Sequence, residues 1–257
     1  MRHTGTKAME QKTGPVHKGV YILPNLFTTA SLFSGFLGLL WAASGEYEAC
    51  AMAILFSALM DGLDGKVARL TNTASEFGVQ YDSLCDLVAF GVAPAFLVWN
   101  WQLKQFGRLG IAVAFLLAVC GALRLARFNI STAVTSKKFF TGLPIPAAGC
   151  TLAAMVFFQP YVPEQLMHAF PAFTLGVTFV LSFLMVSRVR YASFKEYGLI
   201  KAHPFSSMVT AILLFVLVSS EPKLLGFMVF AGYLISGPVY TFIILPRRSH
   251  KLLRSLA

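Results

Sequence analysis

The sequence predicts an all-α membrane protein, a polytopic bundle of about eight transmembrane helices. First, 56% of its 257 residues are hydrophobic and only 12% are charged, whereas an average soluble domain has about 25% charged residues. Second, the mean hydropathy is +0.68, and the apolar residues gather into stretches close to the roughly 20 residues that cross a bilayer. Third, the basic residues alternate between the loops, as is typical of multi-pass membrane proteins.

The predicted spans are separated by short loops. They cover residues 24–43, 47–69, 82–101, 109–128, 144–160, 170–187, 206–220 and 224–245. The fifth and seventh are the shortest. The sequence LPIP at 143–146 breaks the chain before the fifth, because proline interrupts helical hydrogen bonding. Asn25 and Thr28 open the first span, where they either cap the helix or face a ligand. Residues 1–20 form a polar N-terminal segment, residues 21–246 the membrane domain, and residues 247–257 a basic tail.

The distribution of the basic residues predicts the orientation of the bundle. If the N-terminus is cytoplasmic and eight spans alternate, 18 of the 21 Lys and Arg residues face the cytoplasm, and the exceptions are Lys104, Arg108 and Lys223. This bias matches the positive-inside rule, with both termini in the cytoplasm. It also favours the anionic lipids of that leaflet. The net charge of +10 therefore indicates membrane topology rather than binding to nucleic acid.

The cysteines and the N-terminus exclude other classes of protein. The four cysteines, Cys50, Cys85, Cys120 and Cys150, lie singly in different apolar segments, so their spacing predicts neither disulfides nor thiolate metal sites. The polar residues 1–20 run directly into a full span, with no short apolar region followed by a cleavage site. A removable signal peptide is therefore not expected.

All the aspartates of the chain lie between residues 61 and 86. Asp61 and Asp64 are spaced i, i+3 at one end of the second span, and Asp82 and Asp86 are spaced i, i+4 at the start of the third. Each pair lies on one helix face, so two antiparallel helices can direct all four into one pocket. The carboxylates would repel one another unless a cation lay between them, and hard divalent ions prefer oxygen ligands. We therefore expect two Mg²⁺ or Mn²⁺ ions that bind a phosphate or pyrophosphate.

The residues between the aspartates extend this pattern. The chain reads Asp-x2-Asp-Gly-x2-Ala-Arg-x8-Gly-x3-Asp-x3-Asp from Asp61 to Asp86. Gly65 and Gly78 allow a ligand to approach the backbone, and the planar guanidinium of Arg69 suits a phosphate oxygen. The whole pattern, including Ala68, resembles the signature of the CDP-alcohol phosphotransferase family at all eight positions.

The resemblance implies a membrane transferase with a six-helix catalytic core and two further helices. Such enzymes use a CDP-linked donor and a pair of divalent metal ions, cleave the pyrophosphate of the donor, and release CMP. By the same resemblance the metal ligands are Asp61, Asp64 and Asp82. Asp86 is the general base and a further metal contact. The CDP site is formed by Gly65, Arg69 and Gly78, with Ser75 in the break before the third span as a further candidate.

Further stretches are similar to the serine-specific branch of this family, which transfers a phosphatidyl group from CDP-diacylglycerol to L-serine. They are GALRLARFN at 121–129, FTGLPIPAAG at 140–149, PNLFTTASLFSG near the start and SFK at 193–195. An arginine suits the carboxylate of serine, so the predicted acceptor site is Arg124, Arg127 and Asn129. The resemblance also implies a homodimer in the cell membrane with a cytoplasmic active site.

Other interpretations of these residues stay open. The same arginines suit the phosphate of glycerol 3-phosphate or inositol phosphate, and choline is another possible acceptor. Arg124 and Arg127 could instead extend to the membrane surface without a catalytic role. A cation-coupled transporter also buries acidic residues within several spans. Transporters, however, tend to have internal repeats with sites near the bilayer midplane, whereas these acids lie at one end of one helix pair.

Overall fold

The computed structural model describes residues 22–71, 75–132, 139–192 and 221–244. It confirms an all-α membrane bundle. The long helices are α1 (Ile22–Ala43), α2 (Tyr47–Leu70), α5 (Gly107–Thr132), α6 (Ile145–Phe158), α8 (Phe170–Val186) and α11 (Pro222–Val239). The predicted span 206–220 lies outside the described residues.

The third predicted span is one continuous helical run with irregular segments. It contains α3 (Glu76–Asp86), the π-helical η2 (Leu87–Val92), α4 (Ala93–Val98), the π-helical η3 (Trp99–Leu103) and the 3₁₀ turn η4 (Lys104–Phe106). Pro94 has no backbone N–H to donate, and the helix widens just before it, so that Ala93 N–H donates to the carbonyl of Val88. A proline that interrupts the helical ladder accounts for this widening.

The start of this run corrects the sequence-based boundary. The helix begins at Glu76, six residues before the predicted start at Asp82. Ser75 caps it, and its side-chain oxygen accepts a hydrogen bond from Gly78 N–H at 3.0 Å. Hydropathy missed this first turn and a half because Glu76 and Gln80 interrupt its apolar residues. Asp82 and Asp86 therefore lie inside a helix rather than at its beginning.

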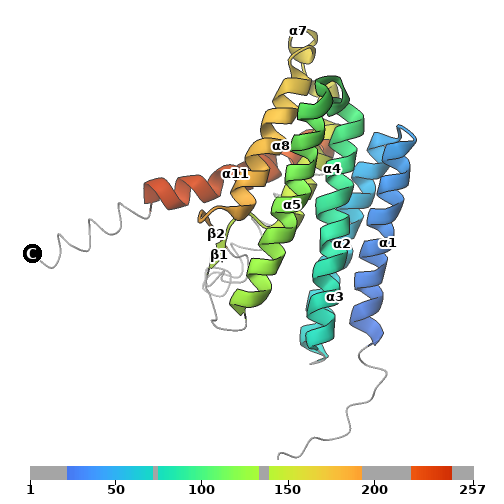
Figure 1. Ribbon diagram of the computed structural model, residues 1–257, viewed down its shortest axis with the longest axis vertical. Helices are drawn as coiled ribbons and strands as arrows, with labels where there is room; N and C mark the ends of the chain where they lie inside the picture. Colours follow the sequence, from blue (N-terminus) through green and yellow to red (C-terminus); the bar gives the residue numbers. More distant parts are fainter. Residues whose placement is uncertain (1–21, 72–74, 133–138, 193–220, 245–257) are drawn as a thin grey trace, which may run out of the picture.

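Close packing of α1, α2 and the α3–α4 run sets the geometry of the bundle (Figure 1). A Cβ at Gly35 would lie 2.7 Å from the Cα of Ala89, and one at Gly149 would lie 3.1 Å from the Cα of Phe90. Small residues at such contacts let helix backbones approach within a membrane. As a result η2 is held between α1 and α6, with Ala89 and Phe90 fully buried.

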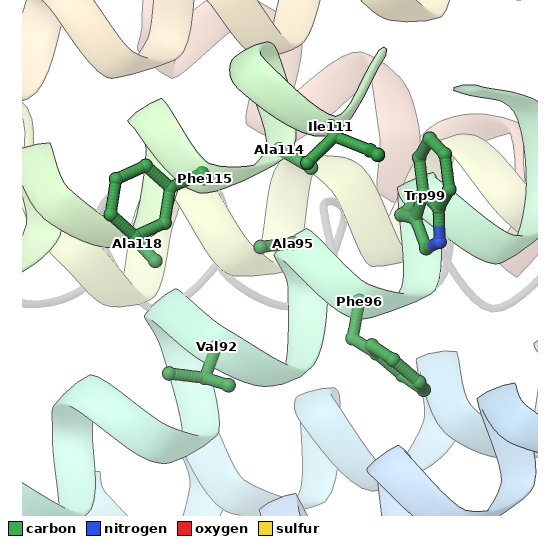
Figure 2. A pocket seen from close by; sticks show the side chains of 8 residues that line it. All are labelled: Val92, Ala95, Phe96, Trp99, Ile111, Ala114, Phe115 and Ala118. Atoms are coloured by element: carbon green, nitrogen blue, oxygen red, sulfur yellow. The ribbon is translucent and has the colours of Figure 1, made fainter. Parts of the chain in front are cut away.

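The α4–α5 turn lies at the end of the molecule opposite α3 (Figure 1). Gly107 has a φ of +54°, a conformation that favours glycine, and there the chain reverses into α5. Between η2, α4 and α5 lies an apolar pocket of about 360 Å³. Figure 2 shows Phe96 and Trp99 from one helical run and Phe115 from the other around it. Its lining carries no ionisable group, so the pocket supplies neither an acid, a base nor a metal ligand.

Two short strands and the last helix complete the described part of the chain. Strands β1 (Phe139–Thr141) and β2 (Arg190–Ala192) pair antiparallel, with Phe140 opposite Tyr191. The short 3₁₀ turn η5 (Gln159–Tyr161) and helix α7 (Glu164–Met167) connect α6 to α8, and the π-helical η7 (Tyr240–Ile244) ends the described chain. Helix α11 packs on α6 and β2 and is inclined to the other long helices in Figure 1.

Polar contacts fasten α11 at its first turn. Lys223 Nζ lies 3.7 Å from Glu48 Oε1 at the start of α2, and the hydroxyl of Tyr161 donates to Glu221 Oε2 at 2.8 Å. Lys223 is one of the three basic residues that the sequence predicts on the outer side. The structure puts it at the first turn of α2, whereas Asp61 and Asp64 lie toward the other end of that helix.

Candidate active site

Three carboxylates from two helices converge in one cluster. Asp61 and Asp64 project from the last turns of α2, and Asp82 projects from α3. Each offers one oxygen atom, and these three atoms lie within 4.8 Å of one another. The i, i+3 spacing on α2 makes this possible, because such residues share a helix face. The structure thus brings together the three residues that the resemblance implies as metal ligands.

Asp64 is the most buried member of the cluster, at 6% exposure, and its carboxylate is held in place. Thr28 Oγ1 of α1 donates a hydrogen bond to Asp64 Oδ2 at 2.7 Å, and the backbone N–H of Gly65 donates a second. Of the two alternatives for Thr28, capping of the first helix is wrong, since α1 begins at Ile22 and Thr28 lies within it. Its hydroxyl orients a carboxylate instead.

Asp86 stands beside the cluster. It lies one turn beyond Asp82 on α3, at the i, i+4 position, and it interacts electrostatically with Asp61, Asp82 and Asp64. Arg124 of α5 also lies within electrostatic range of it. Asp86 does not belong to the group of three oxygen atoms within 4.8 Å. It therefore interacts electrostatically with both the carboxylate cluster and the buried Arg124.

The predicted donor-binding residues lie around the start of α3. Gly78 is close to α1, because a Cβ there would lie 3.7 Å from Asn25 Oδ1 and 3.1 Å from Ser75 Oγ. Ser75 is the helix cap described above, a role that the sequence analysis did not assign to it. Gly65 adjoins Asp64 in α2. The side chain of Arg69 lies outside the described residues. Contact of these residues with a nucleotide stays a prediction.

The three predicted acceptor residues of α5 differ in their surroundings. Arg124 is buried, with its guanidinium carbon 5.9 Å from the centre of the Phe128 ring. Asn129 Nδ2 donates to Ser83 Oγ at 3.0 Å and to Gln80 Oε1 at 3.1 Å, which joins α5 to α3. Arg124 interacts electrostatically with Asp86, whereas Asn129 bonds to the neighbouring helix.

Arg127 caps α8. Its Nη1 donates to the carbonyl of Val186 at 3.0 Å, and its Nη2 donates to those of Ser187 at 3.2 Å and Met185 at 3.4 Å. A guanidinium at this place satisfies carbonyls that lack helical partners and complements the helix dipole. The sequence analysis did not foresee this contact, since Arg127 and α8 are far apart in the chain. Its predicted acceptor role remains a prediction.

The capping contact predicts a structural effect of Arg127. We expect Arg127→Ala to destabilise the fold by about 1.5–3 kcal/mol, as hydrogen bonds to a charged donor are lost, and to lower the Tm in detergent by several degrees. Arg188→Ala is the matched control, because Arg188 is also basic, follows the same helix and is exposed. An unchanged Tm for Arg127→Ala, together with a raised KM for the acceptor, would instead assign Arg127 to the acceptor site.

The carboxylate cluster fits a divalent metal ion. Its donors are oxygen atoms only, which suit Mg²⁺ or Mn²⁺. Among the residues that the structure describes, the one ion pair joins Lys223 and Glu48, so no described Lys or Arg is ion-paired with the cluster. Asp61, Asp64 and Asp82 would hold the ion, and the Thr28 hydroxyl fixes one of them in advance.

Comparisons with known proteins match about two thirds of the chain. The sequence profile of the CDP-alcohol phosphatidyltransferase family matches residues 21–183. The chain is 42% identical over 181 residues to a CDP-diacylglycerol–serine O-phosphatidyltransferase of Helicobacter pylori, covering 69% of this chain and 74% of that protein. It is 33% identical over 176 residues to the Bacillus subtilis protein of the same name, covering 68% and 93%. It is 37% identical over 171 residues to an archaetidylserine synthase of Methanothermobacter thermautotrophicus, covering 66% and 69%.

Proposed function

The chain belongs to the CDP-alcohol phosphatidyltransferase family, and from this we propose that it transfers the phosphatidyl group of CDP-diacylglycerol to L-serine. The products are phosphatidylserine and CMP. The observation that supports this best is the cluster of Asp61, Asp64 and Asp82 with Asp86 and Arg124 beside it. Relatives named for a serine product come from both bacteria and an archaeon, which favours serine over glycerol 3-phosphate, inositol phosphate or choline.

Each aspartate of the site has its own role in the proposed reaction. Asp61, Asp64 and Asp82 would hold two divalent ions, with Asp86 as a further contact. When bound, the ions would supply neutralisation of charge on the donor pyrophosphate. Asp86 takes the proton of the serine hydroxyl. The serine oxygen then bonds to the phosphorus that carries diacylglycerol, while the bond from that phosphorus to CMP breaks and CMP leaves with the electron pair.

The nucleotide end of the donor belongs at the start of α3. Gly65, Arg69, Gly78 and Ser75 form the CDP site in this proposal. The absence of side chains at the two glycines lets the nucleotide approach α2 and α3, and Arg69 binds a phosphate oxygen. The diacylglycerol end then lies in the bilayer, next to the apolar helix faces.

We expect Arg124 to bind the acceptor rather than the donor. Arg124→Gln removes a charge-assisted hydrogen bond worth about 1.5–3 kcal/mol, so the KM for serine rises about 10- to 100-fold while the KM for CDP-diacylglycerol changes little. Both constants follow from steady-state CMP release. Arg108→Gln, at the opposite end of α5, is the control and leaves both constants unchanged. An unaltered serine KM in folded Arg124→Gln would place the acceptor elsewhere.

The function itself is tested with an acceptor panel. Purified protein in detergent is given CDP-diacylglycerol, Mn²⁺ and, in turn, L-serine, glycerol 3-phosphate, inositol phosphate or choline, and both CMP and the lipid product are measured. We expect phosphatidylserine to form and the other acceptors to give no product. If only another alcohol gives a lipid product, that alcohol and not serine is the substrate. Metal-driven uptake into vesicles without CMP release would indicate a transporter.

The same proposal includes the location and assembly of the protein. The positive-inside distribution favours a cell membrane protein with the carboxylate cluster on the cytoplasmic side, where serine and CDP-linked lipids are supplied. A homodimer is the proposed quaternary state. Labelling of single cysteines introduced at residue 75 or residue 108 with a membrane-impermeant reagent in intact cells tests the orientation. Labelling at residue 75 and not at residue 108 would mean that the carboxylate cluster lies on the outer side of the membrane.

A further inference from the structure

The two helices that carry the carboxylate cluster are joined mainly through a third helix. Asp61 and Asp64 belong to α2 and Asp82 belongs to α3, and both helices pack on α1. Among the residues that the structure describes, α2 and α3 have hardly any direct packing against each other. At this end of the bundle, the distance between their carboxylates therefore depends on how α1 holds each helix.

Two adjacent hydroxyls of α1 make these connections. Thr28 Oγ1 donates to Asp64 Oδ2 of α2 at 2.7 Å. The hydroxyl of Thr29, the next residue, lies 2.9 Å from the hydroxyl of Tyr81 in α3. Thr29 Oγ1 also donates to the carbonyl of Asn25 at 2.7 Å. A hydroxyl has one proton to donate, so Tyr81 is the donor in its bond to Thr29.

Tyr81 is well placed to hold Asp82, because the two residues are adjacent on α3. The Tyr81 ring stacks on that of Phe77, one turn earlier, with ring centres 6.0 Å apart and an angle of 8° between the ring planes. On the other side of Asp82, Ser83 Oγ accepts a hydrogen bond from Asn129 Nδ2 of α5 at 3.0 Å. The two neighbours of Asp82 thus fasten α3 to two different helices.

The bond between Thr29 and Tyr81 lies within apolar helices. Thr29 belongs to the candidate membrane span Asn25–Ala43, and Tyr81 belongs to the long apolar run Glu76–Ile130. Water competes weakly for polar groups in such surroundings, and hydroxyl side chains commonly join helices there. This bond is therefore suited to holding α3 on α1.

We propose that Thr29 and Tyr81 are positioning residues for the carboxylate cluster and make it selective for a small divalent ion. This inference rests on the metal site of the proposed function. The hydrogen bond fixes the separation of Asp82 from the two aspartates of α2, whose oxygen atoms lie within 4.8 Å of that of Asp82. Mg²⁺ requires ligands at about 2.0–2.1 Å in a near-ideal octahedron, whereas Ca²⁺ accepts about 2.3–2.6 Å and a flexible geometry. A cluster whose two helices are less firmly held therefore loses Mg²⁺ more than Ca²⁺.

The test measures the Kd of Mg²⁺ and of Ca²⁺ for purified protein in detergent, by isothermal titration calorimetry without substrate. In Tyr81→Phe, which keeps the ring on Phe77, we expect the Mg²⁺ Kd to rise about 10-fold, the lower end for residues that orient metal ligands. The Ca²⁺ Kd should change less than about 3-fold, because that ion tolerates a looser site. Thr29→Val should give the same result, and the double variant should be no worse than either one. Thr29→Ser, which keeps the hydroxyl, should retain the wild-type constants.

Tyr47→Phe is the matched control. It also removes a tyrosine hydroxyl that joins two helical segments, since Tyr47 donates to the carbonyl of Asn100 at 3.0 Å. Tyr47 lies at the opposite end of α2 from the cluster, so we expect a lower Tm and an unchanged Kd for both ions. An equal rise of the Mg²⁺ Kd in Tyr47→Phe and Tyr81→Phe would mean that general loosening of the bundle sets the affinity, and this would overturn the inference. A rise in Tyr81→Phe that Thr29→Val does not reproduce would overturn it as well.

Three further outcomes separate this inference from the function on which it rests. If wild-type protein binds Mg²⁺ and makes phosphatidylserine but Tyr81→Phe keeps the wild-type Kd, the positioning role is wrong and the proposed function stands. If the variants behave as expected but the lipid product comes from another alcohol, serine is wrong as the acceptor and the positioning role is supported. If wild-type protein binds neither ion, the metal site of the proposed function is wrong, and the positioning role is wrong with it.

Discussion

Exhaustive chelation is expected to abolish phosphatidyl transfer, and Mg²⁺ or Mn²⁺ is expected to restore it. Asp61, Asp64 and Asp82 bring three oxygen atoms within 4.8 Å of one another, and like charges at this distance repel unless a cation lies between them. Charge stabilisation by a bound ion is worth several kcal/mol, so we expect a loss of at least about 10³-fold in CMP release.

A binding measurement that does not depend on turnover completes this test. A ligand that binds only the folded state raises the Tm, so Mn²⁺ should stabilise wild-type protein in the absence of substrate. Asp61→Asn should lose most of this shift. Thr28→Val, which removes the hydrogen bond to Asp64, should lose part of it. Full activity after chelation, with no effect of Mn²⁺ on the Tm, would contradict a metal site.

The sequence predicted the helices well because hydropathy carries most of the information in a membrane protein. Within the described residues each predicted span corresponds to a helix, and the largest deviation is the early start of α3. That deviation has a local cause. Glu76 and Gln80 interrupt the apolar residues of this segment, so a span predicted from hydropathy begins later than the helix, whose cap at Ser75 is set by hydrogen bonding.

The carboxylate cluster was predictable from spacing alone, since i, i+3 and i, i+4 pairs fix helix faces. Contacts between distant segments could not be predicted in this way. Thr28 and Asp64 are 36 residues apart, and nothing in either local pattern pairs them. The same holds for Arg127, whose partners lie 58 to 60 residues away. One signal was available for Thr28, because a hydroxyl within an apolar span needs a buried partner.

The packing of the last described helix also lies beyond what the sequence pattern could indicate. Tyr233 stands in an apolar helix, and 14% of the chain is aromatic, yet its ring centre lies 5.5 Å from that of Tyr191 in β2. Spacing thus predicts the carboxylate cluster, while contacts between distant segments depend on tertiary structure. This difference follows from geometry, because the carboxylates share two sequential helices and the two tyrosines do not.

Asp86→Asn and Asp61→Asn are both expected to lower activity, the first through kcat and the second through metal and donor binding. Asparagine is nearly isosteric with aspartate but cannot accept a proton as a base. Because Asp86 lies beside the three-oxygen group and not within it, Asp86→Asn should lower kcat by about 10²- to 10⁴-fold, the usual contribution of a general base. The Kd for CDP-diacylglycerol should change little, and Mn²⁺ should still raise the Tm.

Asp61→Asn removes a member of the cluster itself. We expect it to weaken Mn²⁺ and CDP-diacylglycerol binding together, because the donor pyrophosphate is held through the ions, and excess Mn²⁺ should recover part of the activity. Titration of each variant with Mn²⁺, followed by donor binding at saturating metal, separates the two effects. An equal loss of donor affinity in both variants would make Asp86 primarily a metal ligand, and the proton of the serine hydroxyl would then need another acceptor.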